Sequence, residues 1–171
     1  MNAFMTTGTY EFLKKMKLQH QNENMIIMQN ADTSLLLHET EGNTLFNEPR
    51  RYEVIDASGS IQKQGYVIFN NIPVTDEGRP VFEYRFKNRA RLIEEVAGFV
   101  ALRVLRPLSN DTYIIMTLWE DEESFKGWQN SQQYNKGLEK RGSAEGIDQQ
   151  KNIFSAASYV SEYMIPEEET E

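Results

Sequence analysis

The sequence contains no cysteine. This absence excludes a disulfide framework, a thiolate metal site, an iron–sulfur cluster and a cysteine nucleophile. Positive charge is also scarce, because 18 Lys and Arg residues stand against 26 Asp and Glu residues, for a formal net charge of −8. Nucleic acid and anionic membrane surfaces repel such a chain, so we expect neither as a partner.

Long hydrophobic runs are missing as well. The longest apolar stretches, at 100–104 and 114–119, are far shorter than the ~20 residues that a membrane-spanning helix needs. No basic patch precedes an apolar stretch at the N-terminus, so no signal peptide is predicted. We therefore expect a soluble, cytoplasmic protein, and 171 residues suit one domain or two small fused units.

Residues 61–171 predict a ferredoxin-like α+β domain. After a buried strand at 65–73, apolar residues such as Phe82 and Phe86 recur at helical spacing. Asp121 is a candidate N-cap for a second helix, which we expect to end in a basic turn before Gly142. Three more strands, at 98–107, 112–119 and 157–165, complete the order β-α-β-β-α-β.

Residues 1–60 predict a smaller N-terminal α+β unit. A short apolar segment precedes a helix at 10–20, and two apolar runs at 24–29 and 33–39 resemble a hairpin. A further strand is expected at 52–55, and the small, polar segment 58–64 is the candidate junction between the two units. The architecture resembles that of the second half, although no residue-level repeat links them.

The usual catalytic signals are few. The two histidines, His20 and His38, both lie in the first half without metal-ligand spacing, which favours structural or surface roles. No phosphate-binding glycine loop, serine elbow or His-Glu-x-x-His helix is present. Acidic pairs such as Glu94–Glu95 and Glu122–Glu123 are typical of solvated helix faces, so hydrolase chemistry is not indicated.

Two features of the second half allow both a structural and a functional interpretation. Asn70 and Asn71 lie inside a predicted strand, where asparagine is depleted, and at least one amide should face the covered side of the sheet. They indicate either a strand end that turns polar or an amide that hydrogen-bonds a ligand. Trp128 is either a core residue of its helix or a wall of a ligand pocket.

The same region resembles a known family. The signature Leu-Trp-Glu-x4-Phe-x2-Trp-x2-Ser-x2-Phe/Tyr of the Isd-type heme-degrading monooxygenases is similar to the segment made of Leu118, Trp119, Glu120, Phe125, Trp128, Ser131 and Tyr134. These enzymes belong to the antibiotic biosynthesis monooxygenase superfamily of dimeric α+β barrels. The whole chain looks most similar to the longer HmoB-like members, and it also resembles TRAP proteins around 8–13 and 32–42.

The resemblance implies a heme site and some of its residues. Asn70 matches the family's asparagine, with Asn71 as the alternative in register, and Trp128 matches its tryptophan. Where the family has its axial histidine, this chain has Leu138, which cannot ligate iron. Tyr134 is then the candidate iron ligand, since tyrosine ligation of heme is known chemistry. Asn70, Trp128, Tyr134 and Leu138 are thus the implied heme-contacting set.

The resemblance also leaves further candidates for the iron ligand and for the cations that bind the heme propionates. Tyr84 and Tyr163 are further candidate ligands, and Arg85, Lys87 and Arg89 are candidate cations. The family mechanism treats heme as both substrate and cofactor and also needs O2 and an external electron donor, either a reductase or a small molecule. In this mechanism Trp128 presses on the macrocycle, and the Asn70 amide donates a hydrogen bond beside the iron.

Three functions follow from the resemblance. The first is a heme-degrading monooxygenase, which opens the macrocycle and releases iron. The second is a non-catalytic, TRAP-like stress or signalling protein with a vestigial heme pocket, and the third is a monooxygenase for an aromatic, polyketide-like substrate. Because the N-terminal unit could cover the sheet face that single-domain relatives bury in a dimer, we expect a monomer or a weak homodimer.

Overall fold

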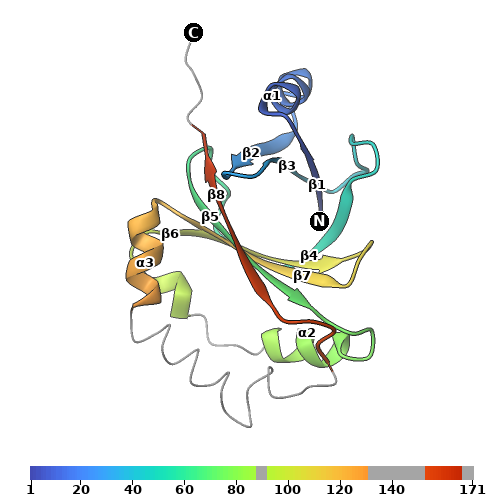
Figure 1. Ribbon diagram of the computed structural model, residues 1–171, viewed down its shortest axis with the longest axis vertical. Helices are drawn as coiled ribbons and strands as arrows, with labels where there is room; N and C mark the ends of the chain where they lie inside the picture. The colour runs from blue at the N-terminus through green and yellow to red at the C-terminus, as the bar shows by residue number, and fades with distance from the viewer. Residues whose placement is uncertain (88–91, 131–152, 167–171) are drawn as a thin grey trace.

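The structure is a computed structural model that describes residues 1–87, 92–130 and 153–166 (Figure 1). Strands alternate with short helices along these residues. In chain order the elements are β1 (Asn2–Gly8), α1 (Tyr10–Gln19), β2 (Asn24–Gln29), β3 (Ser34–Thr40), β4 (Arg50–Ser58), β5 (Gly65–Pro73), α2 (Arg79–Lys87), the 3-10 helix η1 (Leu92–Glu95), β6 (Phe99–Pro107), β7 (Thr112–Trp119), α3 (Glu122–Gln129) and β8 (Tyr159–Ile165).

The strands form one closed barrel in the order β1-β3-β2-β8-β5-β7-β6-β4. Strands β5 to β8 lie in the order β8-β5-β7-β6, with α2 and α3 in the connections, so the predicted ferredoxin-like domain is confirmed. Strands β1 to β4 repeat the same arrangement as β4-β1-β3-β2. In this N-terminal unit the segment 41–49 stands where the second helix of the ferredoxin-like order would be.

The two units meet along two seams. At one seam β4 pairs with β6 from Tyr52↔Pro107 to Ser58↔Leu102. At the other, β2 and β8 share a single pair, Gln29↔Met164. The N-terminal strands thus complete the barrel within one chain, and the expected boundary at residue 60 lies in the connection between β4 and β5.

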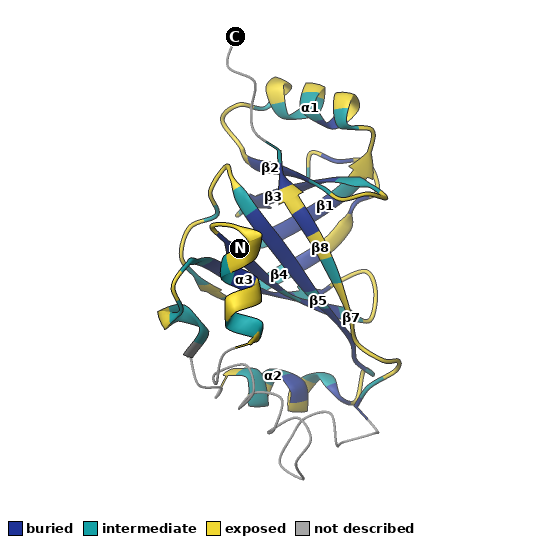
Figure 2. Cartoon of the chain, turned by 60° about the vertical axis from the view of Figure 1, so that its left-hand side comes forward, coloured by how far each residue is buried: buried dark blue, intermediate teal, exposed yellow. Residues whose placement is uncertain are grey.

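Side chains alternate along each strand, so every second residue points into the barrel. The interior is mainly apolar and includes Met5, Met28, Leu37, Phe69 and Met116. Figure 2 shows that long stretches of the strands are buried, whereas the helices present exposed residues. Burial of apolar surface on this scale is the main stabilising contribution to such a core.

One end of the barrel interior holds a buried ion pair. Nε of Arg103 on β6 donates to Oε2 of Glu39 on β3 at 2.9 Å, and both side chains are almost fully buried. Nη1 of the same arginine donates to the carbonyl oxygens of Ser58 at 3.1 Å and Gly59 at 2.9 Å. The pair therefore joins the two units and holds the start of the segment between β4 and β5.

The helices cover the outside of the barrel on different sides. The helix α1 buries Leu13 against Phe4 of β1, Leu36 of β3 and Phe46 of the segment 41–49. The helices α2 and α3 lie over the other sheet, well away from α1 (Figures 1 and 2). Among the described residues no helix has the length and hydrophobicity that a membrane span requires.

Candidate functional site

The outer face of β5 is the centre of the candidate site. On this face Ile68 packs into an aromatic cluster beneath α3, and Ile72 packs into a second cluster beneath α2. Asn70 lies between these two isoleucines and shares their face, because side chains two residues apart in a strand point the same way. One amide therefore interrupts an apolar row at the boundary between the two helix-covered clusters.

The neighbouring strands extend this apolar surface. The residues paired with Asn70 are Ile115 on β7 and Val160 on β8. The side chain of Ile115 is partly buried in the cluster under α2, whereas Val160 is 57% exposed. We call Ile68, Asn70, Ile72, Ile115 and Val160 the platform; it is covered on the β7 side and open on the β8 side.

Asn70 and Asn71 have opposite environments. Asn71 points into the barrel, where its Nδ2 donates to the carbonyl oxygens of Phe69 and Tyr159 and to Oγ of Ser161, at 3.1 to 3.3 Å. The Asn70 side chain makes no hydrogen bond within the part of the chain that the structure describes. Asn70, not the alternative Asn71, thus faces the helices.

The position of α3 over the sheet follows from its N-terminus. Oδ1 of Asp121 accepts hydrogen bonds from the backbone N–H and the hydroxyl of Ser124, both at 2.8 Å, which is an N-cap. These hydrogen bonds lower the pKa of Asp121. Gly98 has φ +87°, and a Cβ there would lie 2.1 Å from Oγ of Ser124. Only glycine fits this close approach, which lets the first turn of α3 lie against the residue that precedes β6.

Trp128 extends from α3 into the cluster below it. Its ring centroid lies 5.6 Å from that of Trp119 and 6.2 Å from that of Phe125. Trp119 is fully buried on β7, and its Nε1 donates to Oγ1 of Thr117 at 3.0 Å. Trp128 itself is only half-buried. It is thus both a member of the packed cluster and an accessible wall beside the platform.

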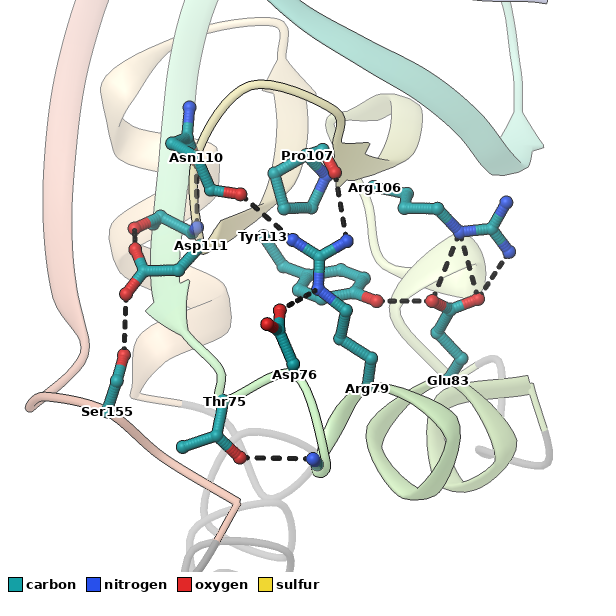
Figure 3. A network of polar contacts seen from close by, with 12 residues as sticks. Thr75, Asp76, Arg79, Glu83, Arg106, Pro107, Asn110, Asp111, Tyr113 and Ser155 are labelled. Carbon is teal, nitrogen blue, oxygen red and sulfur yellow. Dashed lines mark hydrogen bonds and ion pairs between the residues drawn. The ribbon is translucent and has the colours of Figure 1, made fainter.

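A polar network fixes α2 to the sheet (Figure 3). The Glu83 carboxylate accepts hydrogen bonds from the Arg106 guanidinium of β6 and from the Tyr113 hydroxyl of β7. Nη1 of Arg106 also donates to Oε2 of Glu53 on β4 at 3.1 Å. One carboxylate thus links α2 to two strands, and the arginine links it to a third.

The electrostatics of the network favour its charged form. Burial alone would raise the pKa of Glu83, but hydrogen bonds from Arg106 and Tyr113 outweigh it and hold that pKa below its usual range. The hydrogen bond to Glu83 raises the pKa of Arg106. Burial, followed by the hydrogen bond to Glu83, raises the pKa of the Tyr113 hydroxyl. All three groups therefore keep their ordinary protonation states near neutral pH.

Arg79 anchors the N-terminal end of α2. Its guanidinium donates to the carbonyl oxygens of Pro107 at 3.1 Å and Asn110 at 2.9 Å, in the turn between β6 and β7 (Figure 3). It also lies over the Tyr113 ring, 5.7 Å from the centroid. The helix α2 is therefore held at its N-terminus by Arg79 and at its middle by Glu83, which keeps the α2 side of the platform in place.

A pocket of about 350 Å³ opens beside α2. Ile55 and Phe86 give it apolar walls, and Lys87 and Arg106 lie at its rim with two acidic side chains, those of Asp56 and Glu83. Of the cations predicted for heme propionates, Lys87 lines this pocket and Arg85 lies half-buried on α2. Arg89 lies outside the described residues.

The predicted iron ligands are placed as follows. Tyr134 and Leu138 lie outside the described residues, as does the expected helix end at Gly142, whereas the described α3 ends at Gln129. The Tyr163 side chain lies inside the barrel, with its ring 5.0 Å from that of Phe69, and so it does not face the platform. Tyr84 is 70% exposed and lies outside both clusters, so it is not a platform residue either.

Neither histidine is close to the platform. His38 is buried beneath segment 41–49, with Nε2 at 2.9 Å from Oε2 of Glu23 and its ring 5.7 Å from Phe46. His20 follows α1 as its C-cap. Both belong to the N-terminal unit, where a structural role was expected. In the described ranges no group of three or more His, Cys, Asp or Glu side chains could hold a metal ion.

Spacing in the sequence gives no sign of the network around Glu83. Its members come from α2, β4, β6 and β7, and they meet only once the barrel is formed. A polar residue on the apolar face of β6 was the single available signal, since Arg106 follows Leu102 and Val104 in alternation. Alternation alone does not name the partner of such a residue.

Comparison with known proteins places this geometry in context. A model of the family described as antibiotic biosynthesis monooxygenase matches residues 65–140. A protein of Listeria monocytogenes named heme-degrading monooxygenase is 30% identical over 129 residues, which cover 75% of this chain and 77% of that protein. A signal transduction protein TRAP of Staphylococcus epidermidis is 25% identical over 173 residues, covering 99% of each chain.

Solved structures share the barrel. The structure described as a major regulator of staphylococcal pathogenesis superposes with a TM-score of 0.83 over 98% of this chain and 100% of that one, at 24% identity. This likeness shows that the whole eight-stranded arrangement, including the N-terminal unit, is a shared fold.

Proposed function

Because the chain belongs to the antibiotic biosynthesis monooxygenase family, we propose that it binds heme against the platform and degrades it oxidatively, opening the macrocycle and releasing iron. The observation that carries this proposal is the Asn70 carboxamide, which makes no hydrogen bond within the described residues and stands in an apolar surface between two aromatic clusters. A half-buried amide that the chain itself does not hydrogen-bond is available to a ligand.

The residues present fit a large, flat, apolar ligand. Ile68, Ile72 and Ile115 offer apolar surface, and Trp128 offers an aromatic wall. The open side at Val160 gives access from solvent, and Lys87 is a cation for a carboxylate at the α2 end. This combination of mostly apolar walls with a few placed polar groups is typical of small-molecule sites.

In this mechanism the protein binds and orients its substrate. Heme supplies the oxygen chemistry, for which it needs O2 and electrons from an external donor. Asn70 holds an amide N–H at a fixed point above the sheet, where it can hydrogen-bond a polar group at the centre of the ligand. Trp128 is supported from below by Trp119, so it resists displacement when a macrocycle presses on it. The packed clusters exclude water from the covered side.

Iron ligation is the point at which this chain departs from the family pattern. The resemblance puts Leu138 at the position of the family histidine, and the histidines that the chain does contain belong to the N-terminal unit. We propose oxygen ligation, by Tyr134 or by water, in place of imidazole.

A non-catalytic, TRAP-like role is the second candidate. The end-to-end match to a signal transduction protein TRAP and the leucine at position 138 favour it. Both candidates use the same barrel, and they differ in whether heme, once bound, is consumed.

Hemin titration followed by reduction tests the proposal. We expect a saturable change in the Soret band at a single heme per chain, then loss of that band and release of chelatable ferrous iron on adding ascorbate in air. Ile115→Glu puts a charge on the platform and should abolish binding, whereas Leu45→Glu, on an exposed leucine of segment 41–49, should leave it intact. Near-ultraviolet circular dichroism checks that both variants fold.

The outcomes separate the candidates. Saturable binding without loss of heme supports the TRAP-like role and contradicts the monooxygenase. Binding that is not saturable, or that Ile115→Glu does not change, contradicts the heme site at the platform.

A further inference from the structure

The two tryptophans and one tyrosine form a contiguous aromatic path under α3. The chain has two tryptophans, and their ring centroids lie 5.6 Å apart with an interplanar angle of 31°. Tyr66 on β5 is the direct cross-strand partner of Trp119 on β7. Phe125 fills the space beside them, 6.0 Å from Tyr66 and 5.8 Å from Trp119. The path therefore runs Trp128, Trp119, Tyr66 without a polar gap.

The end of this path carries a proton acceptor. The Tyr66 hydroxyl donates to Oε2 of Glu162 on β8 at 2.5 Å. A phenol that loses an electron becomes strongly acidic, so its oxidation is easy only where a base takes the proton at once. Glu162 is exposed, so it can pass a proton to water, whereas the Tyr66 ring is buried. Electron and proton can thus leave Tyr66 in different directions.

No other described tyrosine combines these features. Tyr113 also donates to a carboxylate, that of Glu83, but its ring packs on Phe82 in the cluster under α2. Tyr163 contacts Phe69 inside the barrel. Tyr66 alone, among the residues that the structure describes, adjoins a tryptophan on one side and a carboxylate on the other.

We propose that Trp128, Trp119 and Tyr66 form a one-electron relay that carries oxidising equivalents away from the platform to the surface at Glu162. A one-electron oxidant derived from O2 during heme oxidation at the platform takes an electron from Trp128 and is reduced. Trp119 then gives an electron to the oxidised Trp128, and Tyr66 gives an electron to the oxidised Trp119 while its phenolic proton moves to Glu162. A small-molecule reductant, such as ascorbate or a thiol, then returns one electron to Tyr66, and the proton returns from Glu162. The relay spares Trp128 from irreversible oxidation.

The biological need for this relay rests on the proposed function, because oxidative heme chemistry beside Trp128 is its source of oxidising equivalents. The relay itself is a property of the chain without heme. It can therefore be tested separately, so a failure to bind heme and a failure of the relay give different results.

Pulse radiolysis of the heme-free protein with azidyl radicals is the test. The azidyl radical takes one electron from a tryptophan and becomes azide; Trp119 is fully buried, so the attack falls on Trp128. We expect the tryptophanyl absorption to decay while tyrosyl absorption grows, at a rate that does not depend on protein concentration. Tyr66→Phe keeps the ring but should abolish this growth. Tyr113→Phe, the matched control in the other cluster, should leave it unchanged.

A second variant tests the proton step. Glu162→Gln keeps a hydrogen-bond acceptor but removes the base, so it should slow tyrosyl formation and change its solvent deuterium isotope effect. A merely structural contact between Tyr66 and Glu162 would alter stability without changing either kinetic quantity. The relay is overturned if the wild-type protein shows no concentration-independent transfer, or if Tyr66→Phe transfers as the wild type does.

Discussion

Asn70 and Asn71 are neighbours on β5 that point to opposite faces of the sheet, one toward the helices and the other into the barrel. Their roles should separate accordingly. We expect Asn70→Ala to weaken heme binding or turnover with little change in the free energy of unfolding. Asn71→Ala removes hydrogen bonds to Tyr159 and Ser161 in a buried place and should cost about 2 kcal/mol of stability. Urea unfolding and hemin titration of both variants measure the two effects. If Asn71→Ala were the variant defective in heme binding at unchanged stability, the placement of the site would be wrong.

Trp128 should affect rate more than affinity. Trp128→Phe keeps apolar contact with Trp119 and Phe125, so we expect most of the heme affinity to remain. The smaller ring presses less on the macrocycle, so ascorbate-driven heme loss should slow. The loss of stability should be about 1 kcal/mol, since the residue is half-buried. Equal rates of heme loss in wild type and a stable variant would remove this role.

Glu83 should contribute stability that depends on pH. Its pKa is lowered in the folded state, so its contribution is complete above the unfolded-state pKa and disappears as the pH falls through the folded-state pKa. Glu83→Gln should therefore cost about 1–2 kcal/mol near neutral pH, and the difference from wild type should shrink in acid below the ordinary glutamate range. Urea unfolding of both proteins, from neutral pH to below the ordinary glutamate range, measures this difference in the free energy of unfolding.

Glu53→Gln is the matched control for that experiment. Glu53 contacts the same Arg106 but is about half exposed. Glu53→Gln should therefore lower the free energy of unfolding by less than Glu83→Gln does. A loss equal to that of Glu83→Gln would show that α2 is not held mainly by Glu83.

The buried pair of Arg103 and Glu39 should behave differently from a surface ion pair. Arg103→Leu leaves the Glu39 carboxylate buried without its cation and should cost about 3–5 kcal/mol. Adding Glu39→Leu to the same chain removes the uncompensated charge, so the double variant should recover most of the loss. Chemical unfolding of both single variants and the double variant gives the coupling energy. Additive losses would mean that the two side chains act independently.

The sequence predicts the second half better than the closure of the barrel. The expected strands at 65–73 and 112–119 coincide with β5 and β7, because each is a nearly continuous apolar run that is buried on both faces, by the barrel interior and by the helices. The seams β2–β8 and β4–β6 join segments far apart in sequence, and alternation does not name a partner. The ion pair of Glu39 with Arg103 could not be predicted for the same reason, since its two residues belong to different units of the chain.

The candidate site divides in the same way. Because successive side chains of a strand point to opposite faces, only one of two adjacent asparagines on β5 can face the helices. The sequence does not say which one. The structure decides in favour of Asn70, because Ile68 and Ile72 pack beneath α3 and α2 on its face. Tyr163 looked available as a ligand because aromatic residues fit either face of a strand, and its register against Val67 places it inside the barrel.

Position 138 provides the sharpest test of the family comparison for iron ligation. The resemblance puts the family's histidine where this chain has Leu138. We expect wild-type heme to lack histidine ligation, and Leu138→His to shift the ferric spectrum toward a histidine-ligated form and tighten binding. In the wild-type background, Tyr134→Phe should weaken binding if tyrosine is the ligand and have little effect if water is. A folded Leu138→His variant with an unchanged spectrum and affinity would mean that position 138 does not face bound heme. The monooxygenase proposal would then lose its closest link to the family site, and the TRAP-like role would be the better supported of the two.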